Sequence, residues 1–271
     1  MLTPAFRFAP SPNGRLHLGH AYSALLNERE AKAAGGRFLV RIEDIDTIRC
    51  TEALARACLE DLAWLGLLWE EPVRFQSRHM GDYRDALARL DALGLLYPCT
   101  CSRRDIAEAA GPHLCDPEGQ PLYPGTCRET LRSRDEPHAL RLDMAKACAL
   151  VHAPLAFTEL GEGEIIADPS AWGDVILARR DIATSYHIAV VVDDALQDIT
   201  HVVRGRDLFA ATAIHRLLQE LLGLPVPLYR HHRLIGDEAG RKLSKSAGDR
   251  SLASLRDAGV TPAEIRRELA F

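Results

Sequence analysis

Two histidines near the start of the chain have a spacing that suits chemistry on phosphate. His17 and His20 are three residues apart and follow a segment broken by two prolines and a glycine, where a helix is expected to begin. On the first turn of a helix this spacing puts both imidazoles on one side. Free amides at a helix N-terminus favour phosphate, and imidazoles can stabilise charge that develops on its oxygens. Gly19 leaves room for a nucleotide ring or ribose to approach the backbone. The alternative for the two histidines is a structural role, which is the more common one for a histidine pair at a helix start.

A second candidate site contains two of the chain's four lysines, in a sequence that otherwise uses arginine as its basic residue. Lys242 and Lys245 lie in the run Lys-Leu-Ser-Lys-Ser, between Gly240 and Gly248. Two ammonium groups and two hydroxyls on a mobile loop can wrap a triphosphate and neutralise the leaving pyrophosphate. A basic surface turn is the alternative. Compact point charges are retained only here and at two scattered positions, which favours the functional interpretation.

The elements that must position these groups alternate between strand and helix. A strand at 6–9, a helix from 18 to about 34 and a strand at 38–42 predict a crossover unit with a parallel sheet. Helical patterns follow at 51–65 and 77–94, and strand-like runs at 139–142, 175–177 and 188–192. A second unit pairs a strand at 199–203 with a helix through Leu222. We therefore expect an α/β fold whose parallel sheet is split by an insertion, with domains at 1–95, 96–184 and 185–271.

The seven cysteines divide into two groups. Three of them lie in helix-like or mixed surroundings and are expected to be small core residues: Cys50, Cys58 and Cys148. The other four cluster in the insertion, at Cys99, Cys101, Cys115 and Cys127. The start of the chain lacks a secretion signal, so clustered thiols point to a metal such as zinc rather than to disulfides. Spacing alone leaves the fourth ligand open among His113, Cys115 and Tyr123.

Composition limits the class of protein. The chain has 271 residues, 47% apolar and 26% charged, which excludes intrinsic disorder and collagen-like structure. No apolar run approaches the roughly 20 residues of a membrane helix, so we expect a cytoplasmic protein without membrane contact. The net charge of −5 gives no overall attraction to nucleic acid, but residues 201–271 hold twelve basic and eight acidic side chains. These basic side chains can bind phosphates, or they can belong to a solvated surface with no ligand.

The two phosphate-directed motifs together resemble those of the class I aminoacyl-tRNA synthetases, which carry His-x-Gly-His at the first helix and Lys-x-Ser-Lys-Ser near the end. Four further blocks, at 7–12, 41–46, 186–194 and 199–205, resemble the catalytic domain of the glutamyl-tRNA synthetases and occur in the family's order. The resemblance implies a Rossmann-like domain split by an insertion that contains zinc and is similar to an acceptor-binding subdomain.

The chain differs from full glutamyl-tRNA synthetases after the lysine motif. Those enzymes continue into a large anticodon-binding region, whereas about 25 residues follow Ser246 here. The sequence therefore resembles the truncated paralogues most closely, the glutamyl-queuosine tRNA(Asp) synthetases. The run Arg-Gly-Arg-Asp-Leu at 204–208 also departs from the Arg-Gly-Glu-Asp-His of full synthetases. We expect no anticodon-binding domain.

The resemblance implies roles for individual residues. For glutamate, it implies that the side-chain carboxylate is bound by Arg7, Tyr186 and Arg204, the ammonium by Glu43, and that the pocket is lined by Ala9 and Ser11. For ATP, it implies a site made of His17, Gly19, His20, Lys242, Ser244 and Lys245, with His17, His20, Lys242 and Lys245 as the catalytic groups. Magnesium is expected to accompany ATP. For one structural zinc, it implies Cys99, Cys101, Tyr123 and Cys127, with Cys115 as the alternative to the tyrosine.

The expected reaction activates L-glutamate with ATP to glutamyl-adenylate and transfers glutamate to queuosine at the wobble position of tRNA(Asp), without an obligate protein partner. One alternative enzyme is a truncated glutamyl-tRNA synthetase that charges a tRNA 3′ end. A small nucleotidyltransferase that makes a cofactor is a further alternative, but it would lack the glutamyl blocks. A catalytically inactive RNA-binding protein is the alternative outside enzymes, and it would not need His17, His20 and Lys245.

Overall fold

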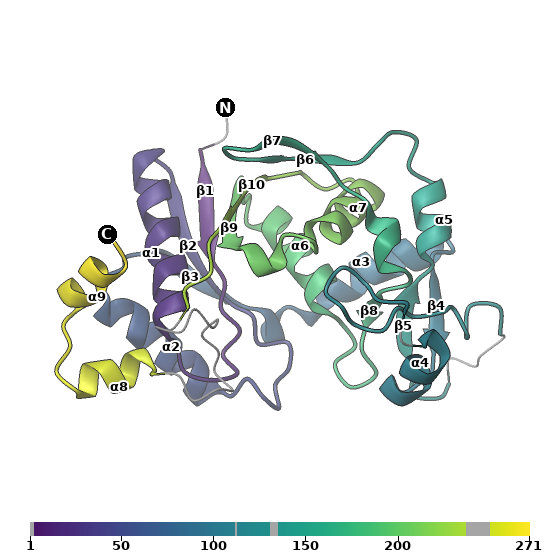
Figure 1. The fold of residues 1–271 in the computed structure, drawn as a ribbon, viewed down its shortest axis with the longest axis horizontal. Coiled ribbons are helices and arrows are strands. Elements are labelled where there is room, and N and C mark those ends of the chain that lie inside the picture. The colour runs from purple at the N-terminus through teal and green to yellow at the C-terminus, as the bar shows by residue number, and fades with distance from the viewer. Residues whose placement is uncertain (1–2, 112, 131–134, 237–249) are drawn as a thin grey trace. The chain divides into compact units, whose positions relative to one another are not determined.

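The computed structural model describes residues 3–111, 113–130, 135–236 and 250–271 (Figure 1). Contacts divide the chain into two compact units. The first contains Met1–Arg78, Asp198–Phe209 and Pro227–Phe271, and the second contains His79–Gln197 and Ala210–Val226. The domain boundaries expected from sequence, after residues 95 and 184, differ from these units and stay a prediction.

The first unit is built on five parallel strands in the order β3-β2-β1-β9-β10. The strands are β1 (Ala5–Phe8), β2 (Arg37–Ile42), β3 (Glu70–Phe75), β9 (His201–Gly205) and β10 (Leu228–His232). Strand β1 lies between β2 and β9, so the order of the strands reverses at β1. Ligands of open α/β sheets bind at such a switch point, beyond the carboxyl ends of the strands.

Helices of the first unit bury their apolar sides against this sheet. They are α1 (Leu18–Ala33), α2 (Glu52–Trp64), α8 (Leu252–Asp257) and α9 (Pro262–Glu268), with short 3₁₀ turns η1 (Gln76–Arg78) and η3 (Arg206–Leu208). The core is aliphatic and aromatic, with Leu25 and Leu26 of α1 and Val40 of β2 each at most 2% exposed. Asn27 also ties α1 to β9, because its Nδ2 donates to the Val203 carbonyl at 3.0 Å.

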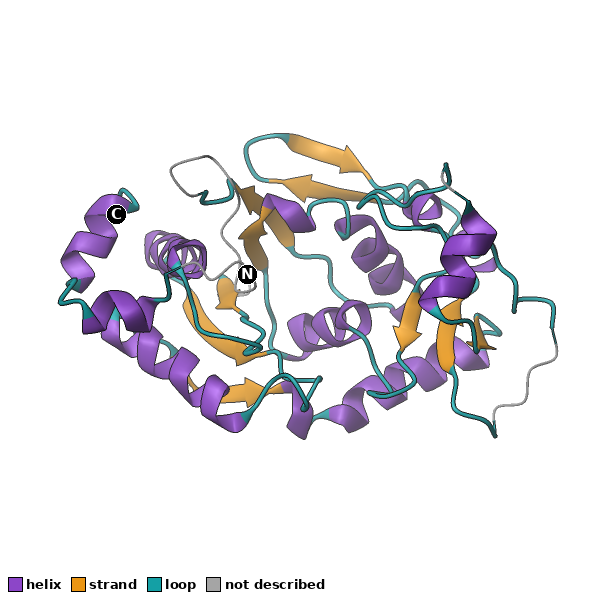
Figure 2. Cartoon of the chain, turned by 60° about the horizontal axis from the view of Figure 1, so that its bottom comes forward, coloured by secondary structure: helices purple, strands orange, loops and turns teal. Residues whose placement is uncertain are grey.

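The second unit combines helices with one three-stranded antiparallel sheet and one further antiparallel strand pair (Figure 2 colours helices and strands separately). One sheet has the order β4-β5-β8, and β6 and β7 form a hairpin. The strands are β4 (Leu96–Cys99), β5 (Ala139–Leu142), β6 (Ala156–Glu159), β7 (Gly163–Ile166) and β8 (Ile176–Ala178). The helices are α3 (Met80–Ala92), α4 (Arg103–Ala110), α5 (Met144–Ala149), α6 (Tyr186–Leu196) and α7 (Thr212–Leu222), with a 3₁₀ turn η2 (Pro169–Trp172). The predicted α/β class, with a Rossmann-like parallel sheet and a separate subdomain holding the cysteines, is confirmed.

The strand expected at 188–192 is wrong, because this run lies inside α6. Ile-Ala-Val-Val-Val has strong β-propensity, but all residues from Ile188 to Asp194 are buried in the structure. A helix enclosed on every side shows no alternation of apolar and polar residues, so its pattern cannot be distinguished from that of a buried strand. Helix α4 was also not anticipated, since Pro98 and the cysteines break the pattern before it. Among the described residues, no helix has the length and hydropathy to cross a membrane.

Candidate active site and metal centre

The first turn of α1 is closed by the two histidines of the His-x-Gly-His motif. His17 is the N-cap residue, with extended backbone, and its Nδ1 accepts the Gly19 N–H at 3.1 Å. His20 accepts the backbone N–H of His17 through its own Nδ1, at 3.2 Å. The two ring centroids are 3.8 Å apart. The histidines therefore act as a reciprocal capping pair, a role that Ser or Thr and Glu fill in most helices.

This capping pair determines which ring nitrogen carries the proton. A nitrogen that accepts an N–H hydrogen bond has no proton of its own, so in each neutral imidazole the proton lies on Nε2. Each Nε2–H is then a donor, which is what a phosphate oxygen requires. The space beside Gly19 holds the His17 ring, since a Cβ at Gly19 would lie 3.0 Å from His17 Cε1. The expected role of Gly19 in admitting a nucleotide stays a prediction.

The lysine motif, with Lys242, Ser244 and Lys245, lies outside the described residues, but the chain that follows it is anchored at the start of α1. Ser251 forms an isolated antiparallel bridge with His17, and the Leu252 N–H donates to the Leu16 carbonyl at 2.8 Å. Ser251 also caps α8 by accepting the Ser254 N–H. Ser251 and Leu252, which follow the lysine motif in sequence, thus lie beside the histidine motif.

Three of the expected glutamate ligands lie at the carboxyl ends of neighbouring parallel strands in the first unit. Arg7 is in β1, Glu43 directly follows β2, and Arg204 is in β9. The Glu43 side chain is 7% exposed and accepts from Arg41 Nη2 at 3.2 Å. Its backbone N–H donates to the Pro10 carbonyl at 3.0 Å, which ties the end of β2 to the loop that contains Ala9 and Ser11. The arrangement brings two guanidinium groups and one carboxylate to a single edge of the sheet.

Arg204 is oriented by a histidine that sequence reasoning missed. Its Nε donates to His231 Nε2 at 3.0 Å, and its Nη2 donates to the Leu208 carbonyl at 3.1 Å. Burial, and after it the positive charge of Arg204, lower the pKa of His231 to about 2. His231 is therefore the neutral acceptor that a guanidinium needs. It lies opposite Arg204 in the β9–β10 register, so predicting that strand pair would have identified it.

The expected Tyr186 ligand belongs to the second unit, where it is the first residue of α6. Its ring centroid is 5.6 Å from that of His215. His215 in turn contacts His187, with 3.2 Å between Nε2 and Nδ1. These contacts form a cluster of three aromatic rings at the start of α6.

A second cluster in the same unit brings together the residues expected to bind zinc. The sulfur atoms of Cys99, Cys101 and Cys127 all lie within 4.8 Å of one another. The hydroxyl of Tyr123 is 3.4 Å from Cys99 Sγ and 3.8 Å from Cys101 Sγ, and it accepts the Cys127 N–H at 2.8 Å. Cys115, the alternative ligand, is exposed and is not part of this group.

The chemistry of these donors fits a metal ion. Burial raises the pKa of Cys101, to about 11. Burial also opposes ionisation of Cys127, but hydrogen bonds from Tyr123, from the Thr100 backbone and from the neighbouring thiols outweigh it and lower the pKa of Cys127 to about 6. The thiolate form of Cys127 is thus favoured near neutral pH. Three sulfur atoms and one oxygen are a set of donors that suits tetrahedral zinc.

Asp174 holds the chain around this cluster in place. Its carboxylate accepts from Arg128 Nη2 at 2.7 Å and from the hydroxyl of Tyr97. Arg141 donates to the Asp174 carbonyl at 2.6 Å, and its guanidinium lies 3.7 Å from the centre of the Tyr123 ring. Tyr97 lies near Cys99 in the sequence, and Arg128 directly follows Cys127. Asp174 therefore links both segments that carry the cysteines to strand β5, which contains Arg141.

Comparison with known families assigns the chain. Residues 5–270 match the catalytic domain of the class I tRNA synthetases (E and Q). The chain belongs to this family. Among curated relatives, it is 50% identical to the glutamyl-Q tRNA(Asp) synthetase of Rhodobacter capsulatus, with 96% of this chain and 98% of that protein covered. It is 45% identical to the glutamyl-Q tRNA(Asp) synthetase of Symbiobacterium thermophilum, with 98% and 85% covered.

Solved structures of class I synthetases share the fold. The glutamate-tRNA synthetase of Elizabethkingia anophelis superposes with a TM-score of 0.73 at 26% identity, over 92% of this chain and 54% of that one. A glutamate tRNA ligase from Elizabethkingia meningosepticum, in complex with its amino acid, gives 0.72 at 27% identity over 92% and 53%. This chain therefore spans about half the length of those synthetases.

Proposed function

We propose that the chain activates L-glutamate with ATP and transfers it to queuosine at the wobble position of tRNA(Asp). The observation that carries the proposal is its 50% identity, over nearly the full length of both chains, to a glutamyl-Q tRNA(Asp) synthetase. The capped histidine pair and the buried guanidinium groups at the sheet edge supply groups that such a reaction needs. ATP and tRNA as substrates place the reaction in the cytoplasm.

The first step is attack of the glutamate α-carboxylate on the α-phosphorus of ATP. The new bond joins the carboxylate oxygen to phosphorus, and pyrophosphate leaves with the electrons of the broken P–O bond. In our proposal, His17 and His20 donate from Nε2 to the α-phosphate oxygens, where charge increases in the transition state. Lys242, Ser244 and Lys245 bind the departing phosphates. Magnesium, when bound with ATP, supplies further neutralisation of these oxygens.

Glutamate is selected by charge. Arg204 and Arg7, together with the hydroxyl of Tyr186, bind the side-chain carboxylate, and Glu43 binds the ammonium group. Arg204 suits this role because its Nε is already occupied by His231 and its Nη2 by a carbonyl. A guanidinium fixed in this way loses little side-chain entropy when substrate binds.

The second step transfers the glutamyl group. A hydroxyl of the queuosine ring attacks the activated carbonyl, an ester bond forms, and AMP leaves with the electrons of the acyl–phosphate bond. The hydroxyl proton passes to solvent. The acceptor base is then itself the identity element, since an unpaired anticodon nucleotide can be splayed out and read in a pocket.

Zinc has a structural role in this proposal. Cys99, Cys101, Tyr123 and Cys127 would hold one ion, and the bound metal would fix the loops that leave β4 and precede β5. Three thiols and a hydroxyl in contact support this ligand set. The alternative with Cys115 is less favoured, because that side chain lies outside the cluster.

The test is an incubation of the protein with labelled glutamate, ATP and tRNA(Asp) that either carries or lacks queuosine. Label on the modified tRNA alone is expected. Equal labelling of both tRNAs, or label on neither, would contradict the proposal.

A second function has structural support, since two glutamate-tRNA synthetases share the fold with TM-scores above 0.7. In that case glutamate would be attached to the 3′ end of tRNA(Glu). Removal of the 3′-terminal adenosine separates the two functions, because it abolishes charging at the 3′ end and leaves transfer to an internal base intact. An inactive RNA-binding protein would give no label under any of these conditions.

A further inference from the structure

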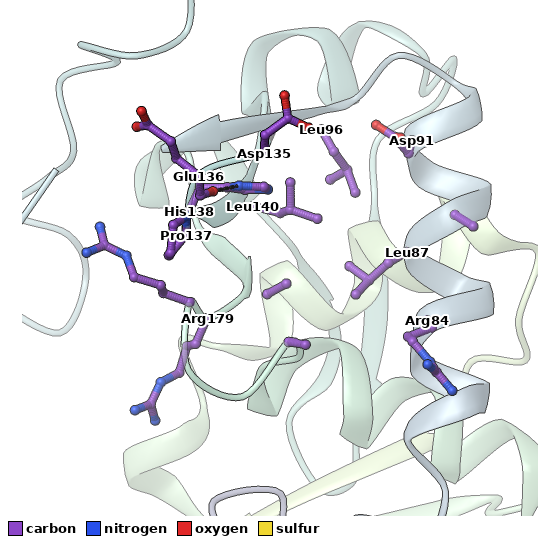
Figure 3. Close-up of a pocket in the computed structure, with 14 residues that line it drawn as sticks. Arg84, Leu87, Asp91, Leu96, Asp135, Glu136, Pro137, His138, Leu140 and Arg179 are labelled. Atoms are coloured by element: carbon purple, nitrogen blue, oxygen red, sulfur yellow. Dashed lines mark hydrogen bonds between the residues drawn. The ribbon is translucent and has the colours of Figure 1, made fainter. Parts of the chain in front are cut away.

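A pocket of ≈ 570 Å³ lies in the second unit, and its lining includes none of the residues assigned above (Figure 3). Its lining comes from α3, from the ends of β4, β5 and β8, and from the loops at 135–138 and 179–183. The apolar part of the lining is made by Leu87, Ala88, Leu96, Pro137, Leu140, Ala178 and Ala183. A pocket of this size holds a small organic ligand of the dimensions of a nucleotide.

The polar lining on one side consists mainly of hydrogen-bond acceptors. Asp91, Asp135 and Glu136 supply carboxylates. His138 Nδ1 lies 2.7 Å from the backbone carbonyl of Glu136, an atom that can only accept, so Nδ1 carries the proton. In the neutral ring, Nε2 is then an acceptor as well. A ligand at this side must therefore donate hydrogen bonds.

The basic lining lies apart from these acceptors. Figure 3 shows Arg84 and Arg179 on opposite sides of the pocket. Arg179 is paired with Asp181 at 2.8 Å, and Arg180 donates to the Thr100 carbonyl at 2.9 Å. Within the part of the chain that the structure describes, Arg84 makes no hydrogen bond or ion pair. Its guanidinium is thus available for an anionic group of the ligand.

We propose that this pocket binds one unstacked nucleotide of the tRNA, distinct from the nucleotide that accepts glutamate. The base lies on the apolar lining beside Leu87 and Ala88 and donates an exocyclic amino group to His138 Nε2, while Arg84 binds a phosphate. Adenine, cytosine and guanine carry such an amino group, whereas uracil has only its N3–H, which lies between two carbonyl oxygens that the carboxylates repel. The inference rests on the proposed function, because it takes the tRNA as substrate.

Filling the pocket without changing its charge is the direct test. Ala88→Trp puts an indole on the exposed surface of α3 where the base would lie, and Ala109→Trp makes the same change at an exposed alanine of α4 outside the pocket. Two rates are measured: transfer of glutamate to queuosine-containing tRNA(Asp), and glutamate-dependent exchange of pyrophosphate into ATP. Loss of one base-stacking site raises the KM for tRNA by about tenfold or more. We expect that rise for Ala88→Trp, with exchange unchanged, and no rise for Ala109→Trp.

The outcomes separate this inference from the proposed function. If wild-type protein exchanges pyrophosphate and transfers glutamate but Ala88→Trp has the wild-type KM for tRNA, the pocket proposal is wrong and the function stands. If Ala88→Trp slows exchange and transfer equally, the pocket affects the catalytic unit instead, which also contradicts the proposal. If wild-type protein transfers no glutamate to queuosine, the proposed function itself fails.

The proposed phosphate contact of Arg84 can be tested separately. Arg84→Ala removes one phosphate contact, so the slope of log affinity for tRNA against log salt concentration should decrease by about 1. Arg56→Ala is the matched control, since Arg56 is an exposed arginine of α2 in an ion pair with Glu52. An equal change in slope for both variants would contradict a phosphate contact at Arg84.

Discussion

His17 and His20 each cap the N-terminus of α1 through Nδ1, so that both imidazoles keep their proton on Nε2. The hydrogen bonds of 3.1 and 3.2 Å that fix this arrangement come from backbone N–H groups of the motif itself. The motif thus positions its own donors before any nucleotide binds. A side chain at Gly19 would crowd the His17 ring, because its Cβ would lie 3.0 Å from His17 Cε1.

Capping and catalysis by His17 can be separated by substitution. Asn is among the best N-cap residues, so His17→Asn should keep the thermal stability of the wild type, whereas His17→Ala should lose about 1 kcal/mol of unfolding free energy. Both variants lack the Nε2–H donor, and both should lose about 10²- to 10³-fold in glutamate-dependent pyrophosphate exchange. Thermal unfolding and exchange rates measure the two effects. An Asn variant with full exchange activity would show that His17 only caps the helix.

Lys245→Ala should reduce pyrophosphate exchange strongly without changing the fold. The ammonium group acts on the departing phosphates, and removal of one such donor typically costs about 10²- to 10³-fold in rate. Circular dichroism would verify the fold, and Lys146→Ala is a control, since Lys146 pairs with Asp143 in the second unit. Near-normal exchange by the Lys245 variant would remove the lysine loop from the mechanism.

We expect one tightly bound zinc per chain, lost in Cys99→Ser and Cys127→Ser and retained in Cys50→Ser. Thiolates bind zinc far better than hydroxyls, whereas Cys50 is buried outside the cluster. Tyr123→Phe keeps the ring beneath Arg141 and removes only the hydroxyl, so it should weaken zinc binding, whereas Cys115→Ser should not. Elemental analysis and chelator competition give the result. Zinc lost from Cys115→Ser but not from Tyr123→Phe would reverse the ligand assignment.

His231 should make the stability of the first unit depend on pH. The pKa of His231 is lowered to about 2 in the folded chain and is about 6.5 when unfolded, so the unfolded state binds one more proton between these values. The contribution of His231 to the free energy of unfolding is full above pH 6.5. Below that pH it decreases by about 1.4 kcal/mol for each pH unit. Denaturant unfolding of wild type and His231→Gln at several pH values measures the difference. Parallel pH profiles for the two proteins would refute a neutral, buried His231.

Sequence reasoning located the parallel unit around β1 and the metal cluster, because both carry strong local signals. The helix start at residue 18 and the strand at 38–42 are marked by turn residues, and Cys99, Cys101 and Cys127 stand out by type. It failed at α6, where complete burial removes the helical periodicity. It also missed His231, because no strand was expected at 228–232 and the contact with Arg204 depends on the pairing of that strand with β9. Local patterns thus predicted elements, whereas tertiary contacts determined their type and partners.

The most direct test of the central claim uses an isolated anticodon stem-loop of tRNA(Asp), which has no acceptor 3′ end of the tRNA. Two hairpins of identical sequence are compared, one with queuosine and one with guanine at the wobble position, each incubated with labelled glutamate, ATP and protein. We predict that the queuosine hairpin accepts glutamate and the guanine hairpin does not. Labelling confined to intact tRNA, and released with its 3′-terminal adenosine, would contradict the proposal.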